Sequence, residues 1–196
     1  MRSHRRGAVQ LALVVAAGFI VGACRLQRPE VVPGRMIEPR LVEPARAPAA
    51  ATSTSVRLLD TQSRAHIGRQ LLRRQPQGEL LEDAIWRWTS APDRYLDTSL
   101  RLVLAASPGV RLVDAGSARS LAVTLVEWHL DAETHRLVGA VTVDVMMPDR
   151  SVGTTVIRAD EAVSADLPGD LAAASGRLLH RLASDVVALA VPPARE

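Results

Sequence analysis

The amino-acid sequence predicts an α+β fold, in which a mixed, largely antiparallel sheet carries two main helices on one face. Two segments have apolar residues spaced three and four apart, as on one side of a helix, and a proline stands in the first turn of each. Between these segments, apolar and polar residues alternate as in strands joined by short turns. The predicted order is strands, helix, antiparallel strands and helix.

The first half of this domain should contain three strands and the first helix. Residues 55–59 are expected to form a strand, while residues 67–73 and 79–88 fit either a strand or a helix. A helix is predicted over residues 92–107, where a Pro-Gly pair ends it. Its apolar stripe consists of Tyr95, Leu96, Leu100, Val103 and Leu104. A short strand over residues 110–113 should follow.

The second half is expected to be a three-stranded meander and a last helix. Residues 121–130 are rich in branched apolar side chains, and residues 137–145 alternate apolar with more polar positions. A turn at Pro148 leads into a third strand over residues 151–163. The last helix is predicted over residues 168–189, with Leu171, Leu178, Leu182, Val186 and Leu189 in its apolar stripe. Together these elements predict a single domain over residues 55–191.

Residues 1–23 are typical of a secretion signal. Three arginines precede an uncharged run from Gly7 to Ala23, which is slightly short for a membrane-spanning helix. The tetrad Val21-Gly22-Ala23-Cys24 resembles the bacterial lipobox, which implies that Cys24 is acylated, for example with palmitate, and becomes the mature N-terminus. An uncleaved membrane anchor and plain secretion are the alternatives. Because Arg25 rather than aspartate follows, the sorting pattern of Gram-negative lipoproteins implies the periplasmic face of the outer membrane.

The composition excludes several classes of function. Without the three signal arginines, the 24 basic side chains fall to 21 and equal the 21 acidic ones, so the mature chain has no basic excess for nucleic acid. The chain has no lysine, which excludes Schiff-base catalysis and the lysine of a phosphate-binding loop. Cys24 is the only cysteine, so no intrachain disulfide can form. No cofactor is expected beyond the covalent lipid on Cys24.

Residues 24–54 are predicted to be the lipidated cysteine and a proline- and arginine-rich tether. Prolines recur every four to six residues, as Pro29, Pro33, Pro39, Pro44 and Pro48. Because proline fixes φ and lacks an N–H donor, neither helix nor sheet is expected here. Such a disordered tether could span roughly 100 Å when extended, or roughly 30 Å as a flexible coil. A passive spacer and a docking segment for a partner are the two interpretations of this composition.

Several features together resemble the ABC-type transport auxiliary lipoproteins, a family that includes the lipoprotein of the paraquat-inducible transport operon. These features are Cys24, Trp88 followed by Pro92, the Leu96, Leu100 and Leu104 helix, the long hairpin from Leu121 to Met147, and the alanine- and leucine-rich last helix. The resemblance covers most of residues 55–190. Family members usually carry tyrosines just before the tryptophan, where this chain reads Leu-Glu-Asp-Ala-Ile-Trp over residues 81–86.

The resemblance implies a non-catalytic accessory protein of a system that moves lipids between two membranes. Its partners would be an inner-membrane permease and ATPase and a periplasmic protein of the mammalian-cell-entry type, together with the membrane that holds its lipid anchor. No nucleic acid is expected, and a homo-oligomer is left open. The alternative functions are a different outer-membrane lipoprotein, acting as an envelope assembly or scaffold factor, and a periplasmic enzyme.

Trp86, Trp88 and Tyr95 are the candidate residues for contact with a partner or with lipid. Large aromatic side chains are favoured at binding hot spots, but they are also favoured in cores. Trp86 and Trp88 lie on one face if their segment is a strand. A place in the core is the preferred interpretation for the tryptophans, and contact with a partner or lipid is the alternative.

The histidines do not define a site. His129 and His135 flank a turn, and Glu127 shares a strand face with His129, but a structural metal site usually needs three or four ligands. All these histidines are therefore expected at the surface, as are His66 and His180. No Gly-x-Ser-x-Gly motif occurs, and no residue pattern places a base beside a nucleophile. The sequence thus predicts no metal site and no catalytic residue.

Overall fold

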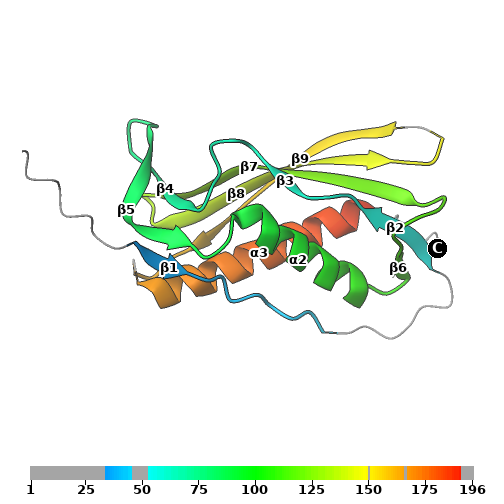
Figure 1. Cartoon of the computed structure of the whole chain (residues 1–196), viewed down its shortest axis with the longest axis horizontal. Helices are drawn as coiled ribbons and strands as arrows, with labels where there is room; N and C mark the ends of the chain where they lie inside the picture. The colour runs from blue at the N-terminus through cyan, green and yellow to red at the C-terminus, as the bar shows by residue number, and fades with distance from the viewer. Residues whose placement is uncertain (1–33, 46–52, 150, 166, 191–196) are drawn as a thin grey trace, which may run out of the picture. The chain divides into compact units, whose positions relative to one another are not determined.

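The computed structural model describes residues 34–45, 53–149, 151–165 and 167–190, and these ranges form one nine-stranded sheet and two helices (Figure 1). The strands are β1 (Arg35–Ile37), β2 (Thr54–Leu58), β3 (Gln62–Ser63), β4 (Gln70–Arg74), β5 (Leu80–Trp88), β6 (Val110–Leu112), β7 (Arg119–Asp131), β8 (Arg136–Met146) and β9 (Ser151–Ala162). The helices are α2 (Pro92–Ala106) and α3 (Pro168–Ala190). The α+β fold class predicted from the sequence is confirmed. The predicted signal sequence, Cys24 and residues 25–33 lie outside the described residues.

The long strand β7 is the centre of the sheet. One of its edges pairs antiparallel with β8 along most of its length, and β8 pairs in the same way with β9. Along its other edge, three short strands pair with β7 one after another, each parallel to it: β2, β3 and β4. Beyond β2 the sheet continues with β6, and beyond β4 it continues with β5 and then β1. The sheet is therefore mixed: the predicted meander β7–β8–β9 and the β4–β5 pair are antiparallel, and the other pairings are parallel.

Both helices pack on the same face of the sheet, which we call the inner face; the opposite one is the outer face. Helix α3 lies against β8 and β9, and α2 packs beside it over β3 and β7. A bulge after Leu125 inserts one extra residue into β7, so the apolar side chains on both sides of the bulge point inward. These side chains are Leu121, Val123, Leu125, Trp128 and Leu130, all in the core.

The two segments whose pattern fitted either strand or helix are strands, β4 and β5. Both helices begin at their predicted prolines and end within one residue of the predicted positions. Helix α3 has 23 residues, but charged side chains interrupt its apolar sequence. Among the residues that the structure describes, neither helix is both long and apolar enough to cross a bilayer.

The stretch predicted as a tether contributes to the fold. The prediction that it forms neither helix nor sheet is wrong for residues 35–37, because these residues form β1 and pair in parallel with β5; residues 38–45 have no helix or strand, as predicted. Ile37 lies opposite Trp88 in this pairing and is buried in the core. Proline removes only its own N–H donor, and the proline-free residues between Pro33 and Pro39 suffice for a short edge strand.

The chain after β1 packs on α3. The backbone N–H of Arg40 donates a hydrogen bond to the carbonyl oxygen of Ala172 at 2.8 Å. The approach is so close that a Cβ on Gly176 would stand 1.7 Å from the Arg40 carbonyl oxygen. The compact unit thus begins at Gly34, well before the predicted boundary at residue 55.

Candidate functional site

Trp88, one of the predicted contact residues, is a core residue. It is 0% exposed, and its ring meets that of Trp128 edge to face, with centroids 5.8 Å apart and planes at 64°. Strand β5 places it on the inner face, where it belongs to the core cluster shared with α2 and α3, and β1 pairs beside it through Ile37. This geometry gives Trp88 a packing role.

Trp86 and Tyr95 are only partly buried, and both lie close to β1. The guanidinium of Arg35 lies over the Trp86 ring, 5.7 Å from its centroid. The Tyr95 hydroxyl accepts a hydrogen bond from the backbone N–H of Ser90 at 3.1 Å and shares another with the Thr89 hydroxyl. Thr89 in turn donates its backbone N–H to the carbonyl oxygen of Ile37 at 3.0 Å. The structure thus gathers the three predicted aromatic residues around the β1 edge of the sheet.

His129 is buried, so its predicted place at the surface is wrong. It is 2% exposed, although it lies on the outer face, which neither of the two described helices covers. The bulge after Leu125 explains this orientation, because it sends Trp128 inward and leaves Glu127 and His129 pointing outward. Neighbouring side chains on the sheet surround the imidazole, and its Nε2 has no hydrogen-bond partner among the described residues.

The charges around His129 favour its neutral form. Burial, together with the cations Arg74 and Arg158, lowers the pKa of His129 from 6.5 to about 4, against the smaller opposing effects of Glu127 and Asp131. Arg158 reaches across to Glu127, with Nη2 and Oε2 3.2 Å apart. In this mixed cluster only His129 is buried, while Arg158 is exposed and Glu127 is partly exposed. No three His, Cys, Asp or Glu residues in the described ranges are placed to share a metal ion.

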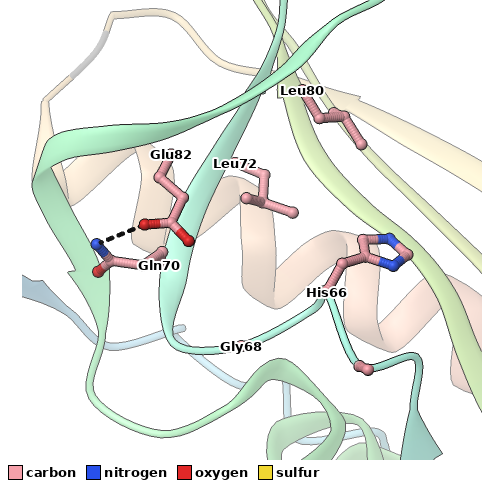
Figure 2. Close-up of a pocket in the computed structure, with 7 residues that line it drawn as sticks. His66, Gly68, Gln70, Leu72, Leu80 and Glu82 are labelled. Carbon is pink, nitrogen blue, oxygen red and sulfur yellow. Dashed lines mark hydrogen bonds between the residues drawn. The ribbon is translucent and has the colours of Figure 1, made fainter.

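A hollow of about 380 Å³ opens on the same outer face, beside the β4–β5 hairpin. Figure 2 shows the residues that line it, among them the polar His66, Gln70 and Glu82 and the apolar Leu72 and Leu80. The Gln70 amide donates to the Glu82 carboxylate at 3.4 Å. The lining residues include no serine, threonine or cysteine, so the hollow offers no hydroxyl or thiol nucleophile. Its polar lining consists of an imidazole, an amide and a carboxylate.

The remaining histidines are spread over the molecule. His66 and His135 are exposed, as expected, whereas His180 on α3 is half-buried. The sequence did not predict the hollow or the burial of His129. The sequence contained a sign of the orientation of His129. The inward-pointing apolar residues of β7 have odd residue numbers up to Leu125 and even numbers from Trp128 onward, and this shift in the alternation marks the bulge.

The comparisons with known proteins show a shared fold. No protein-family model matches this sequence, and no curated protein matches it. A crystal structure of a Xanthomonas campestris protein, described under the family model DUF330, superposes with a TM-score of 0.65 at 15% identity, covering 78% of this chain and 92% of that one.

Two further solved structures have the same architecture. An uncharacterized protein superposes with a TM-score of 0.61 at 11% identity, over 81% of this chain and 97% of its own. A hypothetical protein of Chlamydia trachomatis superposes with a TM-score of 0.54 at 10% identity, over 70% of this chain and 95% of its own. At these identities the likeness concerns the fold, and it spans nearly all of the other proteins.

Proposed function

We propose that this protein is a membrane-anchored accessory lipoprotein of an ABC-type intermembrane lipid transport system. The observation that carries the proposal is an order along the chain: a lipobox-like tetrad ending in Cys24 stands directly before a small α+β domain. That domain shares its fold with a DUF330 protein over 92% of the latter. Both features are compatible with an accessory lipoprotein.

In this proposal each part of the chain has a mechanical role. Acyl chains on Cys24 hold the protein at the periplasmic face of the outer membrane, because buried methylenes stabilise membrane binding. The α+β domain docks to the periplasmic, mammalian-cell-entry-type component, while the permease and ATPase supply the energy at the inner membrane. The sequence lacks a phosphate-binding loop, so ATP hydrolysis belongs to the partner.

The structure changes one element of this mechanism. If the tether ended at residue 54, the domain could stand far from its membrane. Because the fold begins at Gly34, only ten residue steps separate it from Cys24, a reach of about 35 Å even when fully extended. The anchored domain therefore works close to the outer membrane, and the partner must span most of the distance between the membranes.

The experiment that tests docking is co-purification of the acylated full chain with the mammalian-cell-entry-type protein encoded in the same genome. We expect the two to co-purify from detergent-solubilised membranes, and we expect the genes for a permease and an ATPase to lie nearby. Failure of the intact, acylated chain to retain that protein would contradict docking. Retention of an outer-membrane assembly factor instead would favour the alternative, an envelope assembly or scaffold lipoprotein.

A further inference from the structure

One end of the sheet concentrates exposed apolar side chains. Among the described residues, seven large apolar side chains are exposed, and five of them lie on β1, on β5 or just before α3. These five are between 38% and 61% exposed: Met36, Leu80, Leu81, Ile85 and Leu167. Figure 1 shows β1, the β4–β5 hairpin and the beginning of α3 at the same end, which we call the β1 end.

The elements of the β1 end are tied together by contacts. Strand β1 pairs with β5, so that Met36 lies opposite Arg87. The chain after β1 reaches α3 through the hydrogen bond from Arg40 to Ala172, and the Arg40 guanidinium lies 4.0 Å from where a Cβ on Gly169 would stand. The elements that carry these exposed apolar side chains are therefore connected to one another.

Arginines accompany these apolar side chains. Arg35, Arg40, Arg69 and Arg87 are all exposed at the β1 end, and Glu38 is the exposed acid on the same short segment as β1. A second hollow, of about 370 Å³, lies between Met36, Arg69 and Arg87. Arg35 also covers the half-buried ring of Trp86. Arginine, tryptophan and exposed aliphatic side chains together are the composition that suits a membrane–water interface.

The position of this end along the chain supplies the second argument. The β1 end contains Gly34, the first described residue, and only ten residue steps separate it from Cys24. Under the proposed function, on which this inference rests, Cys24 carries the lipid. The β1 end is then held within about 35 Å of the bilayer surface at full extension. The two other exposed apolar side chains are outside the β1 end: Val156 lies in the middle of β9, opposite Thr142, and Leu189 lies near the C-terminal end of α3.

We infer that the β1 end is a docking surface for the phospholipid bilayer, with the arginines on headgroup phosphates and Met36, Leu81 and Ile85 in the interfacial layer. Arginine binds phosphate oxygens through its planar set of N–H donors. The lipid anchor raises the local concentration of this surface at the membrane, so weak contacts suffice to orient the domain. The opposite end, with β6 and the β8–β9 turn, then points into the periplasm, toward the partner.

The test measures which end of the acylated full chain meets lipid. Cys24 is the only cysteine and its sulfur is occupied in the acylated chain, so a single Leu81→Cys variant can carry a polarity-sensitive fluorophore. Val156→Cys is the matched control, because Val156 is also an exposed apolar residue of a strand. The labelled chains are reconstituted into vesicles of phosphatidylethanolamine and phosphatidylglycerol that contain a spin-labelled quencher lipid.

We expect the probe at Leu81 to shift to shorter wavelength and to be quenched several-fold more than the probe at Val156. Adding Arg87→Glu should lower the quenching at Leu81, whereas Arg111→Glu, an exposed arginine on β6 at the opposite end, should leave it unchanged. Equal quenching at the two positions would overturn the inference. The inference would also be overturned if Arg87→Glu left the quenching at Leu81 unchanged.

The outcomes separate this inference from the proposed function. The intact mass of each labelled sample records whether Cys24 is acylated. An acylated chain whose Leu81 probe remains in water overturns bilayer docking but leaves the accessory role standing. If that probe is shielded only when the mammalian-cell-entry-type protein is added, the β1 end is a protein interface and bilayer docking is wrong. A chain that is not acylated at Cys24 overturns both.

Discussion

On the inner face of the sheet, apolar side chains pack against α2 and α3, whereas on the outer face, which neither described helix covers, His129 is buried beside arginines and acids. The inner face is stabilised by removal of apolar surface from water, which is roughly proportional to area and needs no special geometry. The stability of the outer face around His129 depends on the charge state of the titratable side chains there. The two faces should therefore respond differently to truncation and to pH.

The largest effect is expected from Trp88→Ala on the inner face. Trp88 is fully buried against Trp128, so its removal leaves a large cavity and should lower the free energy of unfolding by about 3–5 kcal/mol. Trp86→Ala is the control on the same strand, because Trp86 is only partly buried and should cost less than half as much. Urea denaturation measures both free energies of unfolding. Equal losses of stability in the two variants would contradict the complete burial of Trp88 against Trp128.

The pH dependence of stability should come mainly from His129. Its pKa is about 4 in the folded protein and 6.5 when unperturbed, so the unfolded chain binds the proton more readily. The free energy of unfolding should thus be highest above pH 6.5 and fall as the pH drops toward 4, by at most about 3 kcal/mol. Denaturation curves between pH 7 and pH 4 measure this fall.

Two histidine variants test whether His129 causes this fall in the free energy of unfolding. His129→Gln should flatten the pH profile between pH 6.5 and 4, while His135→Gln, at an exposed histidine, should preserve it. Asp83 and Asp131 affect stability at lower pH, because the pKa of each is lowered in the folded protein. Burial raises the pKa of Asp83, but hydrogen bonds from Arg73, Trp86 and Ile85 outweigh that effect, and hydrogen bonds from Thr134 lower the pKa of Asp131. Their contributions are lost only below about pH 3.8. An unchanged profile in His129→Gln would contradict the buried neutral imidazole.

A smaller effect should follow from Gly176→Ala on α3. An alanine usually stabilises a helix interior relative to glycine, but here its Cβ would collide with the Arg40 carbonyl, so we expect a loss of about 1–3 kcal/mol. Gly169→Ala on the same helix is the control, because no atom lies closer than 4.0 Å to its Cβ position. If Gly176→Ala were stabilising, residues 34–45 would not pack on α3 as described.

Periodicity was sufficient to predict most of the fold. Apolar spacing identified both helices, because Leu96, Leu100 and Leu104 recur once per turn and all face the core. Alternation identified β7 and β8, although it could not decide between strand and helix for residues 67–73 and 79–88. These short strands owe their conformation to pairing with β7 and with each other, which is a tertiary effect that local sequence does not encode.

The sequence could not predict where the domain begins or what surrounds His129. Strand β1 has three residues between prolines, and only its pairing with β5 and the burial of Ile37 make it a strand. The orientation of His129 results from a one-residue bulge in β7, and its charged surroundings come from β4 and β9 as well as from β7 itself. Among the candidate contact residues Trp86, Trp88 and Tyr95, only the structure distinguishes the buried Trp88 from the two that are partly exposed.

The central claim is that Cys24 anchors the domain to a membrane, and intact-mass spectrometry of the full chain, extracted from membranes of a Gram-negative host, tests it most directly. We predict a chain that starts at Cys24 and carries the added mass of acyl groups on that residue, and a Cys24→Ser chain that keeps residues 1–23. A mature chain with an unmodified Cys24, or a wild-type chain that retains residues 1–23, would contradict the account.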